Sequence, residues 1–403
     1  MKEGWVYKKL GEIATTINGL WKGKKEPFVN VGVIRNANFT KDITLDFSKI
    51  EYLNVEERQY QKRKLQKGDL IVEKSGGSEK QPVGRTVLFN AEGEFSVSNF
   101  TSILRINNQN EITPEFLYKY LLYIYREGRT KEMQNAATGI HNIIFEKFLA
   151  ISTPIPSLSE QQRIVSYLDA EFAKIEALKA NAEKQLQAAK DLFQAALKEM
   201  LTPKEGWVEK KLGEIADIKG GKRVPKGYKF ETTKTAHIYI RVADFSNEGT
   251  ISLDDLQYIS DDVYEQIKRY TITSDDVYIS IAGTIGKSGI IPKELNGANL
   301  TENACKLVLK GDVCKEFIYC TTLSSDFKTK IEKMTKVGAQ PKLALTRLAQ
   351  VDISFPHNVS EQQQVAAQLD NLSAKVKQLQ NNYEQTITLC NDLKQSLLKK
   401  IFE

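Results

Sequence analysis

The side chains that most often catalyse reactions or hold metals are few in this sequence and widely spaced. The 403 residues include three histidines and four cysteines, and every cysteine lies in the second half of the chain. The cysteines form no CxxC pair and have no histidine at the spacing of a metal site, and no histidine stands in a recognisable arrangement with a nucleophile. We therefore expect buried or idle thiols and no hydrolase site.

One segment resembles the end of a phosphate-binding loop. Residues 282–288 read Ala-Gly-Thr-Ile-Gly-Lys-Ser, and such a loop needs a glycine where Ile281 stands and a helix after the Lys-Ser pair. The residues that follow, Gly-Ile-Ile-Pro, favour a turn and a strand instead. Lys287 is therefore interpreted as a loop cation, and ATP binding by this segment is not predicted.

Two further catalytic patterns are incomplete. A nuclease of the carboxylate-lysine type needs an acid and then an acid-x-lysine on the next strand to hold Mg²⁺, but Glu73 and Lys74 follow Asp69 without the spacer. An adenine methyltransferase needs an Asn/Asp-Pro-Pro-aromatic tetrapeptide, and the sequence contains none. The sequence predicts a chain that is not an enzyme and holds no metal or cofactor.

Composition indicates a folded protein that is compatible with a polyanionic partner. The hydrophobic fraction is 41%, the net charge is +6, and no apolar run is long enough to span a bilayer. Residues 1–150 carry 23 Lys and Arg against 18 Asp and Glu, and residues 202–355 carry 23 against 21. Because no apolar signal core follows Met1, we expect a cytoplasmic protein with no membrane association; the charge alone does not prove nucleic-acid binding.

An internal repeat organises the chain. A segment that runs from Gly-Trp-Val to Lys-Lys-Leu-Gly-Glu-Ile-Ala begins at Gly4 and returns at Gly206. The tetrapeptide Ser-Glu-Gln-Gln begins at Ser159 and returns at Ser360. Two copies of one unit, with a common framework and variable loops, predict two readers of different targets. Weaker matches at drifting offsets include Ile34 with Ile240, Lys62 with Lys268, Gly84 with Gly286 and Asn99 with Asn303.

Each copy opens with strands and short helices. Runs of β-branched and aromatic residues between Gly- and Asn-rich turns predict strands, and helical stretches interrupt them. This pattern predicts a compact α/β domain of about 150 residues in each copy. The predicted fold class is α+β, and the predicted parts are a first domain at 1–155, a central helix at 156–203, a second domain at 204–356 and a C-terminal helix at 357–403.

A long helix is predicted to close each copy. The Ser-Glu-Gln-Gln motif follows prolines and fits a capping box, in which the serine hydroxyl accepts an orphan N–H and the second glutamine reaches back. Apolar side chains then follow a 4-3 spacing, which is typical of a coiled-coil seam. The predicted seam residues are Ile164, Leu168, Ile175, Leu178, Leu192, Val365, Leu369, Leu372, Val376, Leu379, Leu393 and Leu397.

The two helices are each other's simplest partners. Each would be roughly 60 Å long, and neither would stay helical without burying its apolar stripe. Two helices in a chain that alternates domain and helix pack most economically as an antiparallel pair, with a pseudo-two-fold axis relating the halves. A dimerising coiled coil between two chains, or ordinary packing of a helix on a core, would produce the same stripe. The repetition of both helix and domain favours the antiparallel pair.

The order of these features resembles the specificity subunit of Type I restriction-modification systems over nearly the whole chain. The match consists of a domain, a Pro-then-Ser-Glu-Gln-Gln helix, a Gly-Trp-x-x-x-x-Leu-Gly-Glu-Ile restart, a second domain and a second Glu-Gln-Gln helix. The resemblance implies two target-recognition domains that each read half of an interrupted double-stranded DNA site. It implies spacer helices that set the gap and bind two methyltransferase subunits, and restriction and translocase subunits that join the complex. The methyl donor and ATP are then expected on those partners.

The DNA-contacting residues are predicted from their chemistry. Guanidinium, amide and hydroxyl groups on glycine-rich loops can reach base edges, whereas clustered lysines neutralise phosphates. Each could equally be a solvated surface group, and Arg35 and Arg241, at matched positions, could be scaffold ion pairs; Trp5 and Trp207 are interpreted as core anchors. In the first domain the prediction covers Lys22, Lys24, Lys25, Arg35, Lys74, Ser75, Ser78, Lys80, Gln81 and Arg85. In the second it covers Lys222, Arg223, Arg241, Thr284, Lys287, Asn303 and Gln340.

The main alternative is an interaction scaffold without a DNA role, in which two folded modules on a coiled-coil spacer bind proteins. Loss of DNA binding even in the presence of methyltransferase partners would favour it. A self-contained nuclease or methyltransferase is a second alternative, and activity of the purified single chain would favour that one.

Overall fold

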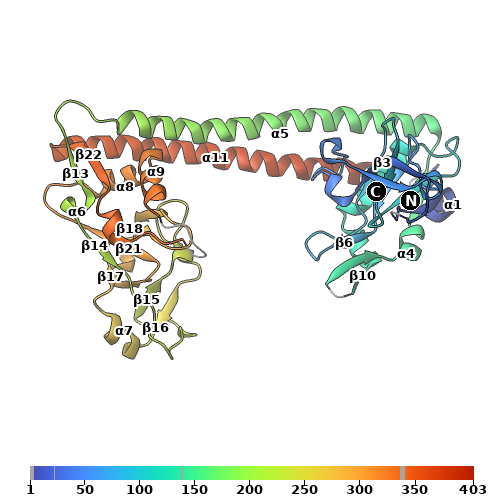
Figure 1. Ribbon diagram of the computed structural model, residues 1–403. Coiled ribbons are helices and arrows are strands. Elements are labelled where there is room, and N and C mark those ends of the chain that lie inside the picture. Colours follow the sequence, from blue (N-terminus) through green and yellow to red (C-terminus); the bar gives the residue numbers. More distant parts are fainter. Residues whose placement is uncertain (1–3, 22, 138, 336–340) are drawn as a thin grey trace. The chain divides into compact units, whose positions relative to one another are not determined.

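The chain folds into two units, each with one α/β domain and parts of two long helices (Figure 1). Unit 1 comprises residues 1–182 and 385–403, and unit 2 comprises residues 183–384. Because each long helix belongs to both units, this division has two parts where the sequence predicted four. The computed structural model describes residues 4–21, 23–137, 139–335 and 341–403.

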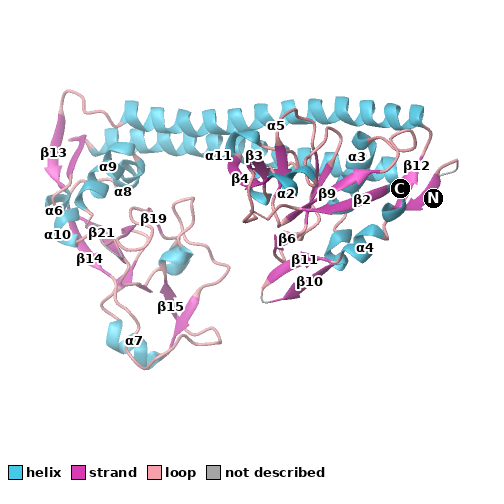
Figure 2. Cartoon of the chain, turned by 45° about the vertical axis from the view of Figure 1, so that its right-hand side comes forward, coloured by secondary structure: helices cyan, strands magenta, loops and turns pink. Residues whose placement is uncertain are grey.

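Small sheets build the domain of unit 1 (Figure 2). The central sheet has the strand order β2-β9-β5-β7, and its strand β5 is buried along its whole length. The run Leu-Ile-Val forms such a strand because β-branched side chains pack well when both faces are covered. Its antiparallel register pairs Ile71 with both Val87 and Ile103. Two other sheets have the orders β4-β3-β8 and β10-β11-β6. The strands are β1 (Val6–Lys9), β2 (Ala14–Asn18), β3 (Phe28–Ile34), β4 (Glu51–Glu56), β5 (Leu70–Glu73), β6 (Ser75–Gly77), β7 (Thr86–Leu88), β8 (Phe95–Val97), β9 (Thr101–Ile106), β10 (Gln134–Ala137), β11 (Ile140–Ile143) and β12 (Ser152–Ile155).

Helix α3 (Pro114–Arg126) packs beside strand β7. The Thr113 hydroxyl accepts the backbone N–H of Phe116 at 3.3 Å, which caps the helix, and the proline that follows Thr113 suits the first helical position. Leu117 and Leu121 of this helix are buried in the core of unit 1. The shorter helices of the domain are α1 (Leu10–Ile13), α2 (Glu57–Gln61) and α4 (Phe145–Leu149).

Unit 2 repeats this arrangement. Its sheets have the orders β14-β21-β18-β19 and β16-β15-β20-β17, and helix α8 (Lys315–Leu323) packs against β18 and β19. The β10-β11-β6 sheet of unit 1 has no counterpart in the described part of unit 2 beyond the bridge between Ala282 and Lys342. The strands are β13 (Trp207–Lys211), β14 (Ala216–Gly220), β15 (His237–Ile240), β16 (Gln257–Ile259), β17 (Thr271–Ile272), β18 (Val277–Ser280), β19 (Ser288–Ile290), β20 (Ala298–Leu300), β21 (Ala304–Leu309) and β22 (Asp352–Pro356). Its other short helices are α6 (Leu212–Ile215), α7 (Asp261–Ile267), α9 (Ser325–Met334) and α10 (Leu345–Leu348).

The repeated Gly-Trp segment ties the start of each domain to the strand that precedes the long helix. Strand β1 pairs antiparallel with β12, and β13 pairs in the same way with β22. Trp5 packs edge-on to Phe116 with ring centroids 6.4 Å apart, and Trp207 packs edge-on to Phe317 at 5.7 Å. Both tryptophans border the hydrophobic cores. The interpretation of these tryptophans as core anchors is confirmed.

A fully buried glutamine fastens helix α5 (Leu158–Met200) to the domain of unit 1. The side-chain oxygen of Gln161 accepts the backbone N–H of Thr113 at 2.8 Å. Its side-chain nitrogen donates to the backbone carbonyls of Glu111 and Pro156, each at 2.9 Å. These bonds pair the oxygen and both N–H donors of a buried amide, so the first turn of the helix has a defined place on the domain.

Gln362 makes the equivalent three bonds in unit 2, where it fastens the start of helix α11 (Val359–Phe402). The predicted capping boxes are wrong in register. The N–H of Glu160 donates to the Ser157 hydroxyl at 3.3 Å, and the N–H of Ser360 donates to the Asn358 side chain at 2.8 Å. Both helices begin earlier than the pattern indicated, so the motif lies inside the first turn and its first glutamine turns to the domain.

The two long helices run antiparallel within unit 1 and pair within one chain. Ile164 and Leu168, near the start of α5, share a core cluster with Leu398 and Phe402, near the end of α11. The ring of Phe402 lies 5.3 to 5.7 Å from three aromatic rings of α3. This pairing is therefore part of the core of unit 1. The predicted fold class is confirmed: an α+β chain with two α/β domains, two long antiparallel helices and an internal repeat.

The helices also pack together within unit 2. Leu197 of α5 and Leu369 of α11 are fully buried and enclose Cys320 of α8. No described helix is both long enough and apolar enough to cross a membrane.

The buried row of the helices differs in part from the predicted seam. Where α11 was expected to bury Leu393, it buries Lys394 instead, and the carboxylates of Asp42 and Glu176 pair with the buried ammonium. Part of the predicted seam is therefore corrected: four of its leucines lie on the surface, with exposed fractions of 42 to 52%. The buried members are Ile164, Leu168, Ile175, Leu369 and Val376, the half-buried ones are Val365, Leu372 and Leu397, and the exposed ones are Leu178, Leu192, Leu379 and Leu393.

Candidate nucleic-acid interface

Three loops of unit 1 are joined by backbone hydrogen bonds. They are the loop after β2 (residues 19–21 and 23–27), the segment at 74–85 between β5 and β7, which contains β6, and the turn at 98–100 before β9. The N–H groups of Lys74 and Ser75 donate to the carbonyl of Phe100 at 2.9 and 3.1 Å. The N–H of Leu20 donates to Val97 at 2.7 Å, and Leu20 forms a parallel bridge with Ser98. We call these segments the three-loop site.

Unit 2 builds a corresponding three-loop site from the loop at 221–236 after β14, the loop at 281–287 between β18 and β19, and the turn at 301–303 before β21. The N–H groups of Ile281 and Ala282 donate to the carbonyl of Asn303 at 2.8 and 3.2 Å, and the N–H of Lys222 donates to Leu300 at 2.8 Å. The loops therefore begin at corresponding positions of the two domains. What differs between the units is the side chains that these common backbone positions carry.

Two glycines allow the loops to come this close. A Cβ atom on Gly19 would lie 1.8 Å from the carbonyl oxygen of Ser98, and one on Gly221 would lie 2.1 Å from that of Thr301. Both contacts are with backbone, which cannot move aside without breaking the site. These positions therefore require glycine because of close approach, independently of backbone angles.

The predicted residues of unit 1 that lie in this site are mostly exposed. Lys24 and Lys25 are exposed in the first loop, and Lys22 lies outside the described residues. Lys74 is half-buried and lies 3.4 Å from the Asn18 side-chain oxygen; burial lowers its pKa. Ser75 is half-buried, whereas Ser78, Lys80 and Gln81 are exposed in the second loop.

Two predicted DNA contacts of unit 1 have structural partners. Arg85 makes a bidentate pair with Glu73, with N–O distances of 2.7 and 2.8 Å and side-chain exposures of 11% and 1%. Burial opposes its charged form, but the hydrogen bonds and charge of Glu73 outweigh burial and raise the pKa of Arg85. Arg35 pairs with Glu51 at 2.6 Å. Because Arg85 and Glu73 are both buried, we leave Arg85 out of the proposed interface. Arg35, like Arg223 of unit 2, pairs with a carboxylate at a partly exposed position, so its DNA contact stays a prediction.

In unit 2 the second and third loops form a hollow of about 700 Å³ that is lined in part by Thr284, Lys287 and Asn303. The fold thus brings together three predicted DNA-contacting residues, two from the second loop and one from the third. The Lys287 ammonium donates to the backbone carbonyl of Phe245, and strand β19 follows Lys287 directly. Gly289 and Ile290 belong to this strand, so the prediction of a strand in place of a helix after the Lys-Ser pair is confirmed.

The other predicted residues of unit 2 have varied surroundings. Lys222 is exposed, and its ammonium lies 5.8 Å from the centre of the Tyr270 ring. Arg223 is exposed and pairs with Glu302 at 2.6 Å. Arg241 is held by the nearly buried Asp244 at 2.6 Å, and Asp244 raises the pKa of Arg241, so we leave it out of the interface. Gln340 lies outside the described residues.

Sequence reasoning missed two exposed aromatic side chains in the three-loop site of unit 1. Trp21 is 68% exposed and Phe100 is 48% exposed. Trp21 stands in the segment Leu-Trp-Lys-Gly-Lys-Lys, and a tryptophan among lysines and glycines was a usable signal for a surface role. Phe100 follows an asparagine and gives no such signal in the sequence.

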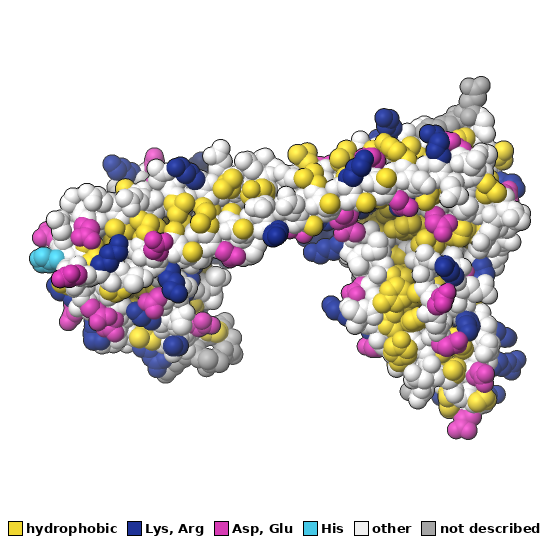
Figure 3. All heavy atoms as spheres, turned by 90° about the horizontal axis from the view of Figure 1, so that it is seen from above, with side chains coloured by type: hydrophobic (Ala, Val, Ile, Leu, Met, Phe, Trp, Pro, Cys, Tyr) yellow, Lys and Arg dark blue, Asp and Glu magenta, His cyan; other side chains and the backbone are white. Residues whose placement is uncertain are grey.

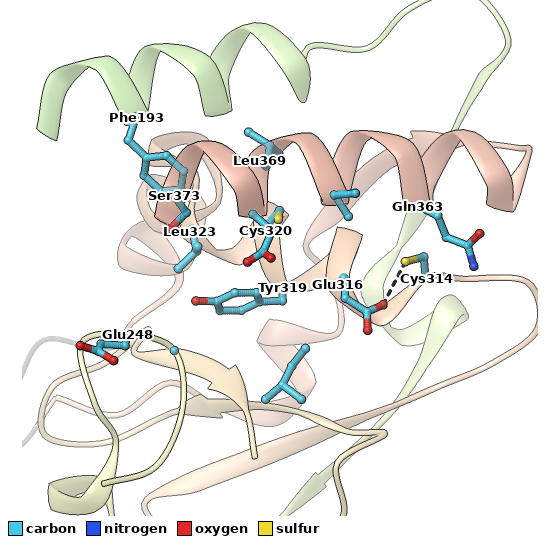
Figure 4. A pocket seen from close by; sticks show the side chains of 15 residues that line it. Phe193, Glu248, Cys314, Glu316, Tyr319, Cys320, Leu323, Gln363, Leu369 and Ser373 are labelled. Atoms are coloured by element: carbon cyan, nitrogen blue, oxygen red, sulfur yellow. Dashed lines mark hydrogen bonds between the residues drawn. The ribbon is translucent and has the colours of Figure 1, made fainter. Parts of the chain in front are cut away.

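A second hollow, of about 620 Å³, lies in unit 2 beside helices α8 and α11 (Figure 4). The Cys314 thiol donates to the Glu316 carboxylate at 3.2 Å. Burial raises the pKa of Cys314 and raises that of Cys320 to about 12, so both thiols are protonated at neutral pH and are poor nucleophiles. All four cysteines are buried, as predicted. Among the described residues no group of three histidine, cysteine or acidic side chains could hold a metal.

Comparisons with known proteins agree with the repeat. Residues 2–188 and 204–389 each match the Type I restriction modification DNA specificity domain. The chain therefore belongs to the Type I restriction-modification DNA specificity family, and the resemblance noted in the sequence is confirmed. These proteins recognise DNA targets for a restriction-modification system.

Particular relatives extend the match along the whole chain. Over the full length, the chain is 23% identical to the StySPI specificity subunit of Salmonella potsdam and 23% identical to the EcoKI specificity subunit of Escherichia coli, covering 89% of each. It is 25% identical to the Escherichia coli EcoBI specificity subunit over 62% of this chain, which spans 57% of that protein.

Solved structures show the same fold. A chain from a study of complex assembly and conformational transition of the type I R-M system has a TM-score of 0.78 at 17% identity, covering 100% of this chain and 98% of that one. The HsdS subunit from Thermoanaerobacter tengcongensis has a TM-score of 0.54 at 17% identity, covering 100% and 97%.

Proposed function

We propose that this chain is the specificity subunit of a Type I restriction-modification complex and reads an interrupted double-stranded DNA site. Each domain reads one half-site through its three-loop site. The observation that carries this proposal is that corresponding backbone hydrogen bonds anchor the three loops in both units, yet the loops present different side chains. A common frame with different surfaces is what two readers of different sequences need.

The charges of the loops support DNA as the partner. Lys24, Lys25 and Lys80 are exposed in unit 1, and Lys222 is exposed in unit 2. Exposed lysines neutralise phosphates and position the protein, whereas Thr284 and Asn303 offer groups that hydrogen-bond base edges. The alternative of an interaction scaffold without a DNA role does not explain why both units repeat this glycine-dependent loop site.

The surface leucines support docking of two methyltransferase subunits on the long helices. Apolar side chains gather along the helices in Figure 3. Leu178 and Leu393 are exposed in unit 1, and Leu379 and Leu192 are exposed in unit 2. Leu178 and Leu379 are 201 residues apart, as are Leu192 and Leu393, so the internal repeat presents one such pair per unit. Equivalent surfaces suit two identical partners.

The remaining parts of the proposal concern chemistry outside this chain. The methyl donor binds the methyltransferase subunits, and ATP binds the restriction or translocase subunits. This chain contributes recognition without catalysis. The complex acts in the cytoplasm. In this proposal, the loops and helices contribute by positioning the partners over DNA.

The decisive experiment is single-molecule methylome sequencing of cells that express this chain with its methyltransferase partner. Cells that lack the chain but keep an active partner are the control. Methylated adenines confined to one split motif, present only with the chain, are the expected result and identify both half-sites. Absence of chain-dependent methylation with a demonstrably active partner would overturn the proposal and favour the interaction scaffold.

A further inference from the structure

Backbone hydrogen bonds define which side chains correspond in the two three-loop sites. The carbonyl of Phe100 accepts from Lys74 and Ser75, and the carbonyl of Asn303 accepts from the two N–H groups at the same place in unit 2. Phe100 therefore corresponds to Asn303. The sequence match of Asn99 with Asn303 is one residue out of register, because insertions shift the offsets.

The first loops can be matched in the same way. The N–H of Leu20 donates to the last residue of β8, and the N–H of Lys222 donates to the last residue of β20. The next residues, Trp21 and Arg223, therefore correspond. Unit 1 carries two aromatic rings at positions where unit 2 carries a guanidinium and an amide.

The surroundings of the rings favour a partner that offers both charge and apolar surface. Trp21 and Phe100 are exposed at 68% and 48%, on loops held together by the backbone. Lys24, Lys25 and Lys74 belong to the same site. Lysines beside exposed rings suit a nucleic acid, whose phosphates take the cations and whose bases offer flat apolar faces.

We infer that the two domains read DNA by different chemistry at these two matched positions. Trp21 and Phe100 of unit 1 contact bases through their apolar rings, whereas Arg223 and Asn303 of unit 2 hydrogen-bond base edges. This inference rests on the proposed function and adds the specificity-determining residues and their mode of contact. Rings can fill an opened base step or pack on a thymine methyl. The Phe100 ring has no hydrogen-bonding group and the Trp21 ring has only one donor, so neither can match a pattern of donors and acceptors.

The first test separates apolar from ionic contact by salt dependence. The variants are Trp21→Ala and Phe100→Ala, measured in the complex with the methyltransferase partner on a duplex that carries the identified site. Each is expected to weaken binding about ten-fold with an unchanged slope of log K against log salt, because ring contacts release no counterions. Lys24→Ala should instead lower the slope by about one. Unchanged affinity in both ring variants would overturn the inference.

Modified bases test the contact directly. 2-Aminopurine placed in the first half-site should brighten when the wild-type complex opens a base step, and thymine-to-uracil replacement should weaken binding when a ring packs on the methyl group. Either response, abolished by Trp21→Ala or Phe100→Ala, supports the inference. Absence of both responses would contradict it.

A chemistry exchange tests which half-site the rings read. Trp21→Arg combined with Phe100→Asn gives unit 1 the side chains of unit 2, and methylome sequencing should show a changed first half-site and an unchanged second. Tyr52→Ala removes a comparably exposed ring from strand β4, outside the three loops, and is the matched control. An unchanged first half-site in a folded double variant would overturn the inference while leaving the proposed function intact. Loss of chain-dependent methylation in the wild type would instead remove the proposed function.

Discussion

At the scale of single residues, burial separates scaffold charges from those available to DNA. Arg85 was predicted to contact bases because it lies in a glycine-rich loop. The Glu73 carboxylate that it pairs with is almost fully buried, and the Arg85 guanidinium neutralises that carboxylate. We expect Arg85→Ala to destabilise unit 1 by about 3–5 kcal/mol, because an uncompensated carboxylate would remain buried. Urea unfolding of the whole chain, followed by near-ultraviolet circular dichroism, measures this.

The control for this prediction is Lys80→Ala, which removes an exposed cation from the same loop. Its free energy of unfolding should equal that of the wild type within about 0.5 kcal/mol. If Arg85→Ala left stability unchanged but abolished recognition of one half-site, Arg85 would be a reader after all.

At the scale of elements, one buried glutamine connects each long helix to its domain. Gln161→Ala should destabilise unit 1 by about 2–4 kcal/mol, since three backbone groups would lose their partners in a buried place. Gln162→Ala changes the exposed neighbour in the same motif and should have almost no effect. Thermal unfolding of both variants, side by side, makes the comparison. Equal melting temperatures would show that the buried amide is dispensable.

The exposed leucines of the helices belong to the same scale. Leu178→Asp with Leu393→Asp should remove one of two methyltransferase subunits from the complex, because buried charge without a partner is costly at an interface. Native mass spectrometry reports the stoichiometry. Leu192→Asp with Leu379→Asp should do the same through unit 2. A complex that kept both subunits in either variant would place docking elsewhere.

At the scale of the whole molecule, the helices and the domains have separate tasks. Deleting residues 183–189 and 384–390, which are equivalent under the repeat, removes one heptad from each helix and keeps their faces in register. We expect the gap between half-sites to shorten by about three base pairs, given about 1.5 Å per helical residue and about 34 Å per DNA turn. Methylome sequencing should show unchanged half-sites; altered half-site bases would refute the division of tasks.

Domain exchange tests the same division from the other side. Replacing residues 1–155 with the equivalent domain of another family member should change one half-site and leave the other and the gap unchanged. Sequencing of the methylated sites in cells with the hybrid provides the measurement. Simultaneous change of both half-sites would mean that the domains do not read independently.

The sequence by itself determined the repeat, the α+β class and the two long helices. These features depend on order and periodicity along the chain: the segments at Gly4 and Gly206 are nearly identical, and apolar side chains recur every three or four residues. The family resemblance rests on the same order. Glycines such as Gly19 could not be assigned a role from order alone, since the atoms that exclude a side chain there come from Ser98.

Only the tertiary structure decided which residues meet. The partner of Arg85, the three bonds of Gln161 and the correspondence of Phe100 with Asn303 all join groups that insertions and folding bring together. The helix seam shows the same limit: periodicity predicted an apolar stripe, but α11 buries Lys394, paired with Asp42 and Glu176, and leaves Leu393 on the surface. Local patterns specify elements, whereas contacts between distant backbone and side-chain groups specify the site, and those contacts are a property of the folded chain.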